Sequence, residues 1–123
     1  MRILIVEDEQ ALAKVLEEKL IKSGFEAKIA GDGEAALYAA DVFKPEMILL
    51  DLILPKKDGF EVLKELKANP SLASIPVIVL SNLGEDENLK KAFALGAKDY
   101  FVKSQHPINE IIDKIKNIRV SGK

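Results

Sequence analysis

The side chains best suited to chemistry in this sequence are carboxylates that directly follow short apolar runs. Glu7 and Asp8 follow the apolar residues 3–6, and Asp51 follows the apolar residues 47–50. Three carboxylates held close together repel one another, and a hard divalent cation such as Mg2+, which takes oxygen ligands, relieves that repulsion. A carboxylate can also act as a nucleophile and form an aspartyl phosphate. These residues therefore favour a Mg2+ site beside a phosphoryl-accepting Asp51.

A hydroxyl and an ammonium follow two further apolar runs. Ser81 follows residues 77–80, and Lys103 follows residues 100–102. Lys103 would pair with one phosphoryl oxygen as a point charge, and Ser81 would donate a hydrogen bond to another. Alone, each residue has an ordinary interpretation: Asp8 as a helix cap, Asp51 as a loop acid, Ser81 as a loop hydroxyl, Lys103 as a surface lysine. A site is favoured because four of the five expected strands deliver a suitable group to one edge.

The elements that would position these groups are strands and helices in alternation. The apolar runs are short and continuous, which is typical of parallel strands covered on both faces. Between them, apolar residues recur at helical spacing. This order predicts an α/β fold with five helices around a five-stranded parallel sheet. Since ligands of such sheets bind outside the carboxyl ends of the strands, the polar groups are expected to converge there. The expected strands are residues 3–6, 26–30, 47–50, 77–80 and 100–102.

Composition excludes several other classes of function. The 123 residues fit one domain, expected at residues 1–120 with a tail at 121–123, and 48% of them are apolar. The net charge of -2 does not indicate a basic surface that could bind nucleic acid, and no apolar run is long enough to span a membrane. There is no cysteine and one histidine, His106, which is expected at the surface, so a zinc site is not predicted. The short N-terminal apolar run does not fit a signal peptide, which favours a cytoplasmic protein.

Taken together, the motifs resemble the receiver domain of bacterial two-component response regulators, of the kind related to chemotaxis regulators. The resemblance covers nearly the whole chain. It implies a flavodoxin-like, doubly wound parallel sheet with the strand order 2-1-3-4-5. The matching segments are residues 3–8 (ILIVED), 49–55 (LLDLILP) with Asp58-Gly59, 79–81 (VLS), 96–100 (GAKDY) and Lys103.

The resemblance also implies ligands, a cofactor and partners. Glu7 and Asp8 would hold Mg2+, directly or through water, together with Asp51 and the backbone carbonyl of Ile53. Asp51 would accept the phosphoryl group from a histidine kinase or a histidine phosphotransfer protein. The chain would thus act in signal transduction or a phosphorelay, and would catalyse only its own phosphorylation and dephosphorylation.

A conformational switch is implied as well. Ser81 and Tyr100 would form the switch pair, and Lys103 would contact a phosphoryl oxygen. The spacing of the pair predicts that Tyr100 turns inward as Ser81 moves toward the phosphoryl group. An output partner, or a second copy of the chain, is then expected on the face formed by the elements of Leu89, Tyr100 and Ile111.

The sequence departs from the common family pattern near the site. Ser104 stands where the family usually has a proline after the lysine, so the Lys103–Ser104 peptide is expected to be trans. Asn82 replaces the usual small residue after the switch hydroxyl. The two positions that flank the path of hydrolytic water in the family are apolar here, Ile53 and Leu83. A slow loss of the phosphoryl group is therefore predicted.

Two alternatives remain open on the sequence. The first is a phosphatase of the haloacid dehalogenase type, which needs a second acid two residues after the nucleophile. That position is Ile53 here. The second is a degenerate receiver used only for protein contacts, against which the presence of Glu7, Asp8, Asp51 and Lys103 argues. The sequence does not indicate the cognate kinase, the output or the oligomeric state.

Overall fold

The computed structural model describes residues 1–121, in which five strands alternate with five helices. No helix within these residues combines the length and the apolarity that crossing a bilayer requires. The predicted tail at 121–123 lies outside the described residues except for Ser121, which ends the last helix. The strands are β1 (Arg2–Val6), β2 (Glu26–Ala30), β3 (Met47–Leu50), β4 (Val77–Ser81) and β5 (Asp99–Val102). The helices are α1 (Gln10–Lys22), α2 (Gly33–Phe43), α3 (Gly59–Ala68), α4 (Asp86–Ala94) and α5 (Ile108–Ser121).

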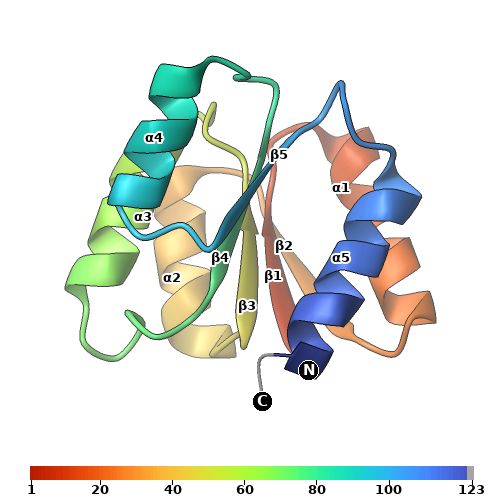
Figure 1. Ribbon diagram of the computed structural model, residues 1–123. Helices are drawn as coiled ribbons and strands as arrows, with labels where there is room; N and C mark the ends of the chain where they lie inside the picture. The colour runs from red at the N-terminus through yellow and green to blue at the C-terminus, as the bar shows by residue number, and fades with distance from the viewer. Residues whose placement is uncertain (122–123) are drawn as a thin grey trace.

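The five strands form one parallel sheet in the order β2-β1-β3-β4-β5, which confirms the predicted fold. The wholly buried β3 is central, and β2, with exposed charged residues at alternate positions, is an edge strand. In Figure 1, α2, α3 and α4 lie to the left of the sheet, and α1 and α5 lie to the right. The chain therefore crosses from one face of the sheet to the other as it winds through the fold.

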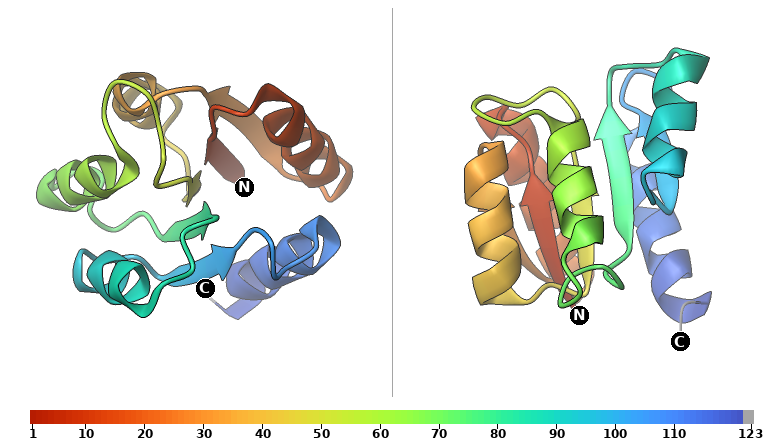
Figure 2. Two further views of the ribbon diagram at one scale, coloured as in Figure 1. Left: turned by 90° about the horizontal axis from the view of Figure 1, so that it is seen from above. Right: turned by 90° about the vertical axis from the view of Figure 1, so that its left-hand side faces the viewer.

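Two separate cores result from the alternation of side chains along each strand. Leu4, Val6 and Leu50 belong to the core that packs under α2, α3 and α4. Ile3 and Ile5, their neighbours in β1, belong to the core under α1 and α5. Figure 2 shows the two groups of helices from above, with the sheet between them. Because both faces of the sheet are covered, the inner strands β1, β3 and β4 are continuous apolar runs, and their polar groups lie at the strand ends.

Two helices that begin beside the strand ends are capped by aspartates. The Asp32 carboxylate accepts a hydrogen bond from the Ala35 N–H at the start of α2. The Asp58 carboxylate accepts one from the Glu61 N–H at the start of α3. A side-chain oxygen at this position satisfies a backbone donor that the helix itself leaves without a partner. These caps fix where the adjoining loops end.

At the other end of the strands, where β1 begins, the Arg2 side chain binds the C-terminal end of α2. Its guanidinium donates to the carbonyl oxygens of Phe43 and Lys44 over 2.7–3.1 Å, at a helix end whose last turn has no basic residue. Arg2→Ala is expected to lower the free energy of unfolding by about 1–2 kcal/mol, because charged hydrogen bonds to helix-terminal carbonyls are lost. Chemical denaturation monitored by circular dichroism measures this change.

Lys28→Ala is the matched control for Arg2→Ala. The Lys28 ammonium and the Arg2 guanidinium lie at 5.7 and 5.9 Å from the centre of the Phe43 ring, but the hydrogen bonds to the helix end come from Arg2. The control is expected to cost at most about 0.5 kcal/mol, since exposed cation–π contacts are weak. Equal losses in the two variants would contradict the helix-end interpretation.

Candidate functional site

The polar groups that follow the strands converge at one edge of the sheet. Glu7 and Asp8 follow β1, Asp51 follows β3, Ser81 ends β4, and Lys103 follows β5. Since β1, β3, β4 and β5 are neighbours in the sheet, their carboxyl ends place these residues side by side. The convergence predicted from the strand ends is therefore present in the structure.

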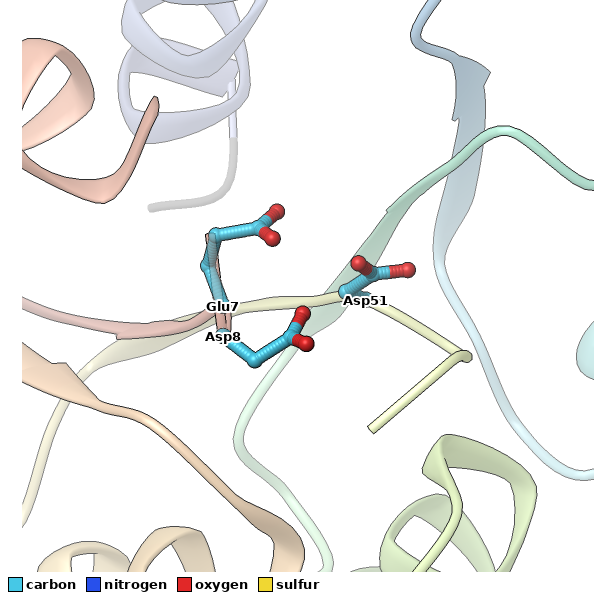
Figure 3. A group of neighbouring side chains, drawn as sticks. All are labelled: Glu7, Asp8 and Asp51. Atoms are coloured by element: carbon cyan, nitrogen blue, oxygen red, sulfur yellow. The ribbon is translucent and has the colours of Figure 1, made fainter. Parts of the chain in front are cut away.

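The three carboxylates of the cluster offer oxygen ligands in one place. Ligand oxygens of Glu7, Asp8 and Asp51 all lie within 4.8 Å of one another. Figure 3 shows Glu7 and Asp8 at the end of one strand and Asp51 at the end of its neighbour. Glu7 and Asp51 are buried, whereas Asp8 is exposed. A set of oxygen donors that is open on one side fits a hard cation that retains some of its water, as Mg2+ does.

Lys103 pairs with both buried carboxylates of this cluster but supplies only one positive charge. Its ammonium lies 2.6 Å from a Glu7 oxygen and 3.0 Å from the Oδ2 of Asp51. Burial lowers the pKa of Lys103, but the hydrogen bonds to Glu7 and Asp51 outweigh burial, so the pKa lies above its ordinary value. The lysine is therefore charged at neutral pH and contacts the carboxylates of both Glu7 and Asp51.

Glu7 remains costly to ionise in spite of this partner. Burial is the largest influence and raises its pKa above the ordinary value, and the charge of Asp51 acts in the same direction. The Lys103 hydrogen bond and the Glu9 N–H, which donates to Glu7, act in the opposite direction without cancelling burial. The cluster thus carries uncompensated negative charge, which a bound cation would relieve.

Glu7→Gln is expected to raise the stability of the metal-free protein at neutral pH. An acid whose pKa is raised on folding binds more protons in the folded state, so its ionisation lowers stability as the pH rises above 4.5, its ordinary pKa. The stability advantage of the variant should therefore shrink as the pH falls toward 4.5. Thermal unfolding in chelator-containing buffers at several pH values measures it.

Glu9→Gln, at an exposed neighbouring position, serves as the control and should behave as the unaltered chain. Added Mg2+ should reverse the order of stability, because Glu7→Gln removes one anionic ligand. A variant that is less stable than the unaltered chain at every pH without metal would contradict this interpretation of Glu7.

The loop that follows Asp51 folds back onto its own first residues. The Asp51 Oδ1 accepts a hydrogen bond from the Ile53 N–H at 3.2 Å, and the Gly59 N–H donates to the Leu52 carbonyl at 2.8 Å. A Cβ atom at Gly59 would lie 2.4 Å from the Asp51 carbonyl oxygen and 2.3 Å from the Leu52 Cα. Only glycine fits there, so Gly59 holds the backbone of Asp51 and Leu52 in place by close packing.

The proposed switch residues meet at the backbone of Leu83. The fully buried Ser81 accepts a hydrogen bond from the Leu83 N–H at 3.3 Å, and the Tyr100 hydroxyl donates to the Leu83 carbonyl at 2.5 Å. Burial, followed by the charge of Asp51, raises the pKa of Tyr100. Tyr100 is thus already inward in this structure, so its inward position does not require a phosphoryl group.

Three smaller expectations have mixed outcomes. The structure has no cis peptide bond within residues 1–121, so the Lys103–Ser104 peptide is trans as predicted. The capping role considered for Asp8 is wrong, because Glu9 is the N-cap of α1 and makes no side-chain cap. His106 is half-buried rather than simply exposed, since its ring meets Phe101 edge-on and pairs with Glu110.

A pocket of about 720 Å3 opens beside the carboxylates. Glu7 and Asp8 line it together with Lys14 at the start of α1, and Asp32 and Pro55 form part of its wall. No pattern in the sequence indicates that the β2–α2 and β3–α3 loops adjoin here. The pocket leads from solvent to the acidic cluster and offers a small group access to it.

Comparisons with known proteins agree with this geometry. Residues 3–116 match the family described as the response regulator receiver domain. A 117-residue segment is 37% identical to the alkaline phosphatase synthesis transcriptional regulatory protein PhoP of Bacillus subtilis, covering 95% of this chain and 48% of PhoP. The chain therefore spans about half the length of the curated relatives it matches.

Two solved structures share both fold and sequence with the chain. The phosphorylated cyanobacterial phytochrome response regulator RcpA is 32% identical, with a TM-score of 0.84 over 99% of this chain and 95% of RcpA. The Mn(2+)-bound form of response regulator Rcp1 is 35% identical, with a TM-score of 0.78 over 95% of this chain and 90% of Rcp1.

Proposed function

Because the chain belongs to the family of response regulator receiver domains of two-component systems, we propose that it is a phosphoacceptor whose acceptor is Asp51. The phosphoryl group would come from a histidine kinase or a histidine phosphotransfer protein in the cytoplasm, in a step that depends on Mg2+. The observation that carries the proposal is the setting of Asp51. Its carboxylate lies within 4.8 Å of the ligand oxygens of Glu7 and Asp8 and 3.0 Å from the Lys103 ammonium.

The donor set fits a divalent cation, which would be held by Glu7, Asp8, Asp51 and the Ile53 carbonyl and would offset charge on the phosphoryl oxygens. A carboxylate oxygen of Asp51 attacks phosphorus in line with the bond to the donor histidine. The phosphorus–oxygen bond forms as the phosphorus–nitrogen bond breaks, and the electron pair of the broken bond leaves with the histidine ring.

Two side chains would respond to the new charge on Asp51. The Lys103 ammonium, now 3.0 Å from the Asp51 Oδ2, would shift to a phosphoryl oxygen, where it stabilises the anion. The Ser81 hydroxyl, which now accepts from the Leu83 N–H, would turn to donate to another phosphoryl oxygen. Lys103 already contacts Asp51, and Ser81 ends β4, the strand next to β3, so both groups are on elements that adjoin the proposed acceptor.

The properties of two relatives support this proposal from outside the chain. Rcp1 has been solved with bound Mn(2+), and RcpA has been solved in a phosphorylated form. A chain that shares their fold at 32–35% identity and carries an oxygen-donor cluster is a reasonable candidate for the same chemistry. In this proposal the chain catalyses only its own phosphorylation and dephosphorylation.

Incubation with a small phosphodonor, with Mg2+ or with a chelator, followed by intact mass measurement, tests the proposal. A lasting gain of one phosphoryl group that requires Mg2+ is the expected result. Steady consumption of the donor without a lasting gain would instead indicate a phosphatase, and no reaction would indicate a receiver used only for contacts. A phosphatase of the haloacid dehalogenase type carries its second acid at the position of Ile53. The apolar side chain there favours a lasting gain of one phosphoryl group over phosphatase turnover.

The output surface is proposed on the elements α4, β5 and α5. Tyr100 and Ile111 are buried, so they identify these elements rather than contact a partner. Exposed side chains there include Lys90 and Phe93 of α4. A partner protein or a second copy of the chain would bind this face.

Addition of Mg2+ and beryllofluoride, a phosphoryl mimic, is expected to alter amide hydrogen exchange on the α4–β5–α5 face. When Ser81 turns toward the acceptor, the Leu83 N–H loses its partner, and the backbone that holds the Tyr100 hydroxyl shifts. Exchange mass spectrometry measures the change, with peptides of α2 as an internal reference. Unchanged exchange on this face would contradict the coupling.

A further inference from the structure

The turn between β2 and α2 packs against the loop between β3 and α3 through a contact that only glycine permits. A Cβ atom at Gly33 would lie 2.3 Å from the Lys57 carbonyl oxygen and 2.6 Å from the Lys57 Cβ. The Gly33 N–H is also 3.4 Å from the Pro55 carbonyl oxygen, to which it donates. Asp32, the preceding residue, accepts from the Ala35 N–H, which fixes the turn to the start of α2.

The loop segment that Gly33 touches has a sharply bent backbone. The Lys57 N–H donates to the Pro55 carbonyl at 2.7 Å, which closes a three-residue turn around Lys56. Lys56 has a φ of 67°, in the left-handed region of backbone conformation that residues other than glycine rarely adopt. Such a backbone persists where the surroundings hold it in place. The Pro55 carbonyl, which accepts from both Gly33 and Lys57, joins the bent turn to the β2–α2 turn.

The position of this turn in the chain connects it to the proposed cation site. Ile53, whose carbonyl is the proposed backbone ligand, lies two residues before Pro55 and is itself 56% exposed, so its side chain is poorly anchored. Its N–H is fixed by the Asp51 carboxylate at 3.2 Å. Gly59 anchors the far end of the same loop on Leu52. The Gly33 contact therefore supports the middle of the loop through its backbone, whereas the Lys57–Glu65 ion pair holds a side chain there.

We infer that Gly33 is a positioning residue for cation binding, because its packing on Lys57 and Pro55 holds the loop that presents the Ile53 carbonyl. This inference rests on the proposed function. Any side chain at Gly33 must push the Lys57 backbone away, and the displacement reaches Ile53 through the short bent turn. Partners that orient metal ligands from outside the ligand shell typically change metal affinity by about tenfold or more.

Gly33→Ala is expected to weaken Mg2+ binding about tenfold, as measured by calorimetric titration of folded protein well below its unfolding temperature. Gly31→Ala is the matched control: it lies in the same turn, and a Cβ there would meet nothing within 4 Å. The control should bind Mg2+ as the unaltered chain does. A glycine needed only for packing would change the unfolding temperature of Gly33→Ala and leave its Mg2+ affinity unchanged, which would overturn the inference.

A second pair of variants covers the case in which Gly33→Ala does not fold. Asp32→Asn keeps an oxygen that can accept from the Ala35 N–H, whereas Asp32→Ala removes it and loosens the turn; both remove the same charge. Asp32→Ala is expected to bind Mg2+ about threefold more weakly than Asp32→Asn does. This change is smaller than the one expected for Gly33→Ala, because loosening the turn removes only part of the support of the loop. Equal affinities would overturn the inference. Failure of the unaltered chain to bind Mg2+ would overturn the proposed function as well, so the two failures are distinguishable.

Discussion

Asp51→Asn is expected to abolish phosphoryl uptake from a small phosphodonor in the presence of Mg2+. An amide lacks the anionic oxygen that attacks phosphorus, so no acyl phosphate can form at that position. The substitution keeps the size of the side chain and removes one of three neighbouring carboxylates, so the metal-free fold should keep its stability. Intact mass after incubation with the donor, together with thermal unfolding, measures both effects.

The matched control for this experiment is Asp58→Asn in the same loop. Asp58 is exposed and caps α3, and asparagine caps helices equally well. The control should gain one phosphoryl group as the unaltered chain does. A phosphorylated Asp51→Asn protein would show that another residue accepts the group.

The second large expected effect concerns the lifetime of the phosphorylated state. The phosphoaspartate is expected to decay slowly, because Ile53 and Leu83 offer no hydrogen bond to orient a hydrolytic water. The combined variant Ile53→Asn and Leu83→Glu should speed decay on the order of a hundredfold, which is typical of one well-placed group that orients water or accepts its proton. The decay of purified phosphoprotein with Mg2+ present, followed by intact mass, measures the rate.

The structure makes this substitution practicable. Ile53 is 56% exposed, and Leu83 is half-buried at the margin of the core, so polar side chains there displace little buried apolar surface. The hydrogen bonds that join Ser81 and Tyr100 to Leu83 involve its backbone N–H and carbonyl, which the substitution retains. Ile53→Val with Leu83→Met is the apolar control and should leave the lifetime unchanged. Decay of the unaltered phosphoprotein within seconds, or no acceleration in the polar variant, would contradict this account.

The parts of the fold that could be predicted from sequence are those set by periodicity. Continuous apolar runs such as residues 47–50 identified buried parallel strands, and the groups that follow them, including Asp51 and Lys103, were placed at one edge of the sheet. The structure places them together because strand order brings β1, β3, β4 and β5 side by side. The order itself came from the family resemblance, since local pattern does not determine which strands are neighbours.

Features that depend on contacts between distant loops could not be predicted. Nothing in the sequence around Gly33 or Gly59 indicates that a Cβ atom at either position would lie within 3 Å of the backbone of another segment. The inward position of Tyr100 likewise depends on a carbonyl 17 residues away in the chain. The capping role considered for Asp8 was wrong because a local pattern cannot show where the first helical turn starts in space.

The most direct test of the central claim is to identify the residue that carries the phosphoryl group. Borohydride reduces an aspartyl phosphate to homoserine, so the phosphorylated protein can be reduced, digested and sequenced by mass spectrometry. This account predicts homoserine at position 51 in samples treated with phosphodonor and Mg2+, and its absence in samples treated with chelator. Homoserine at position 8, at any other position, or nowhere in a protein treated with Mg2+ would contradict it.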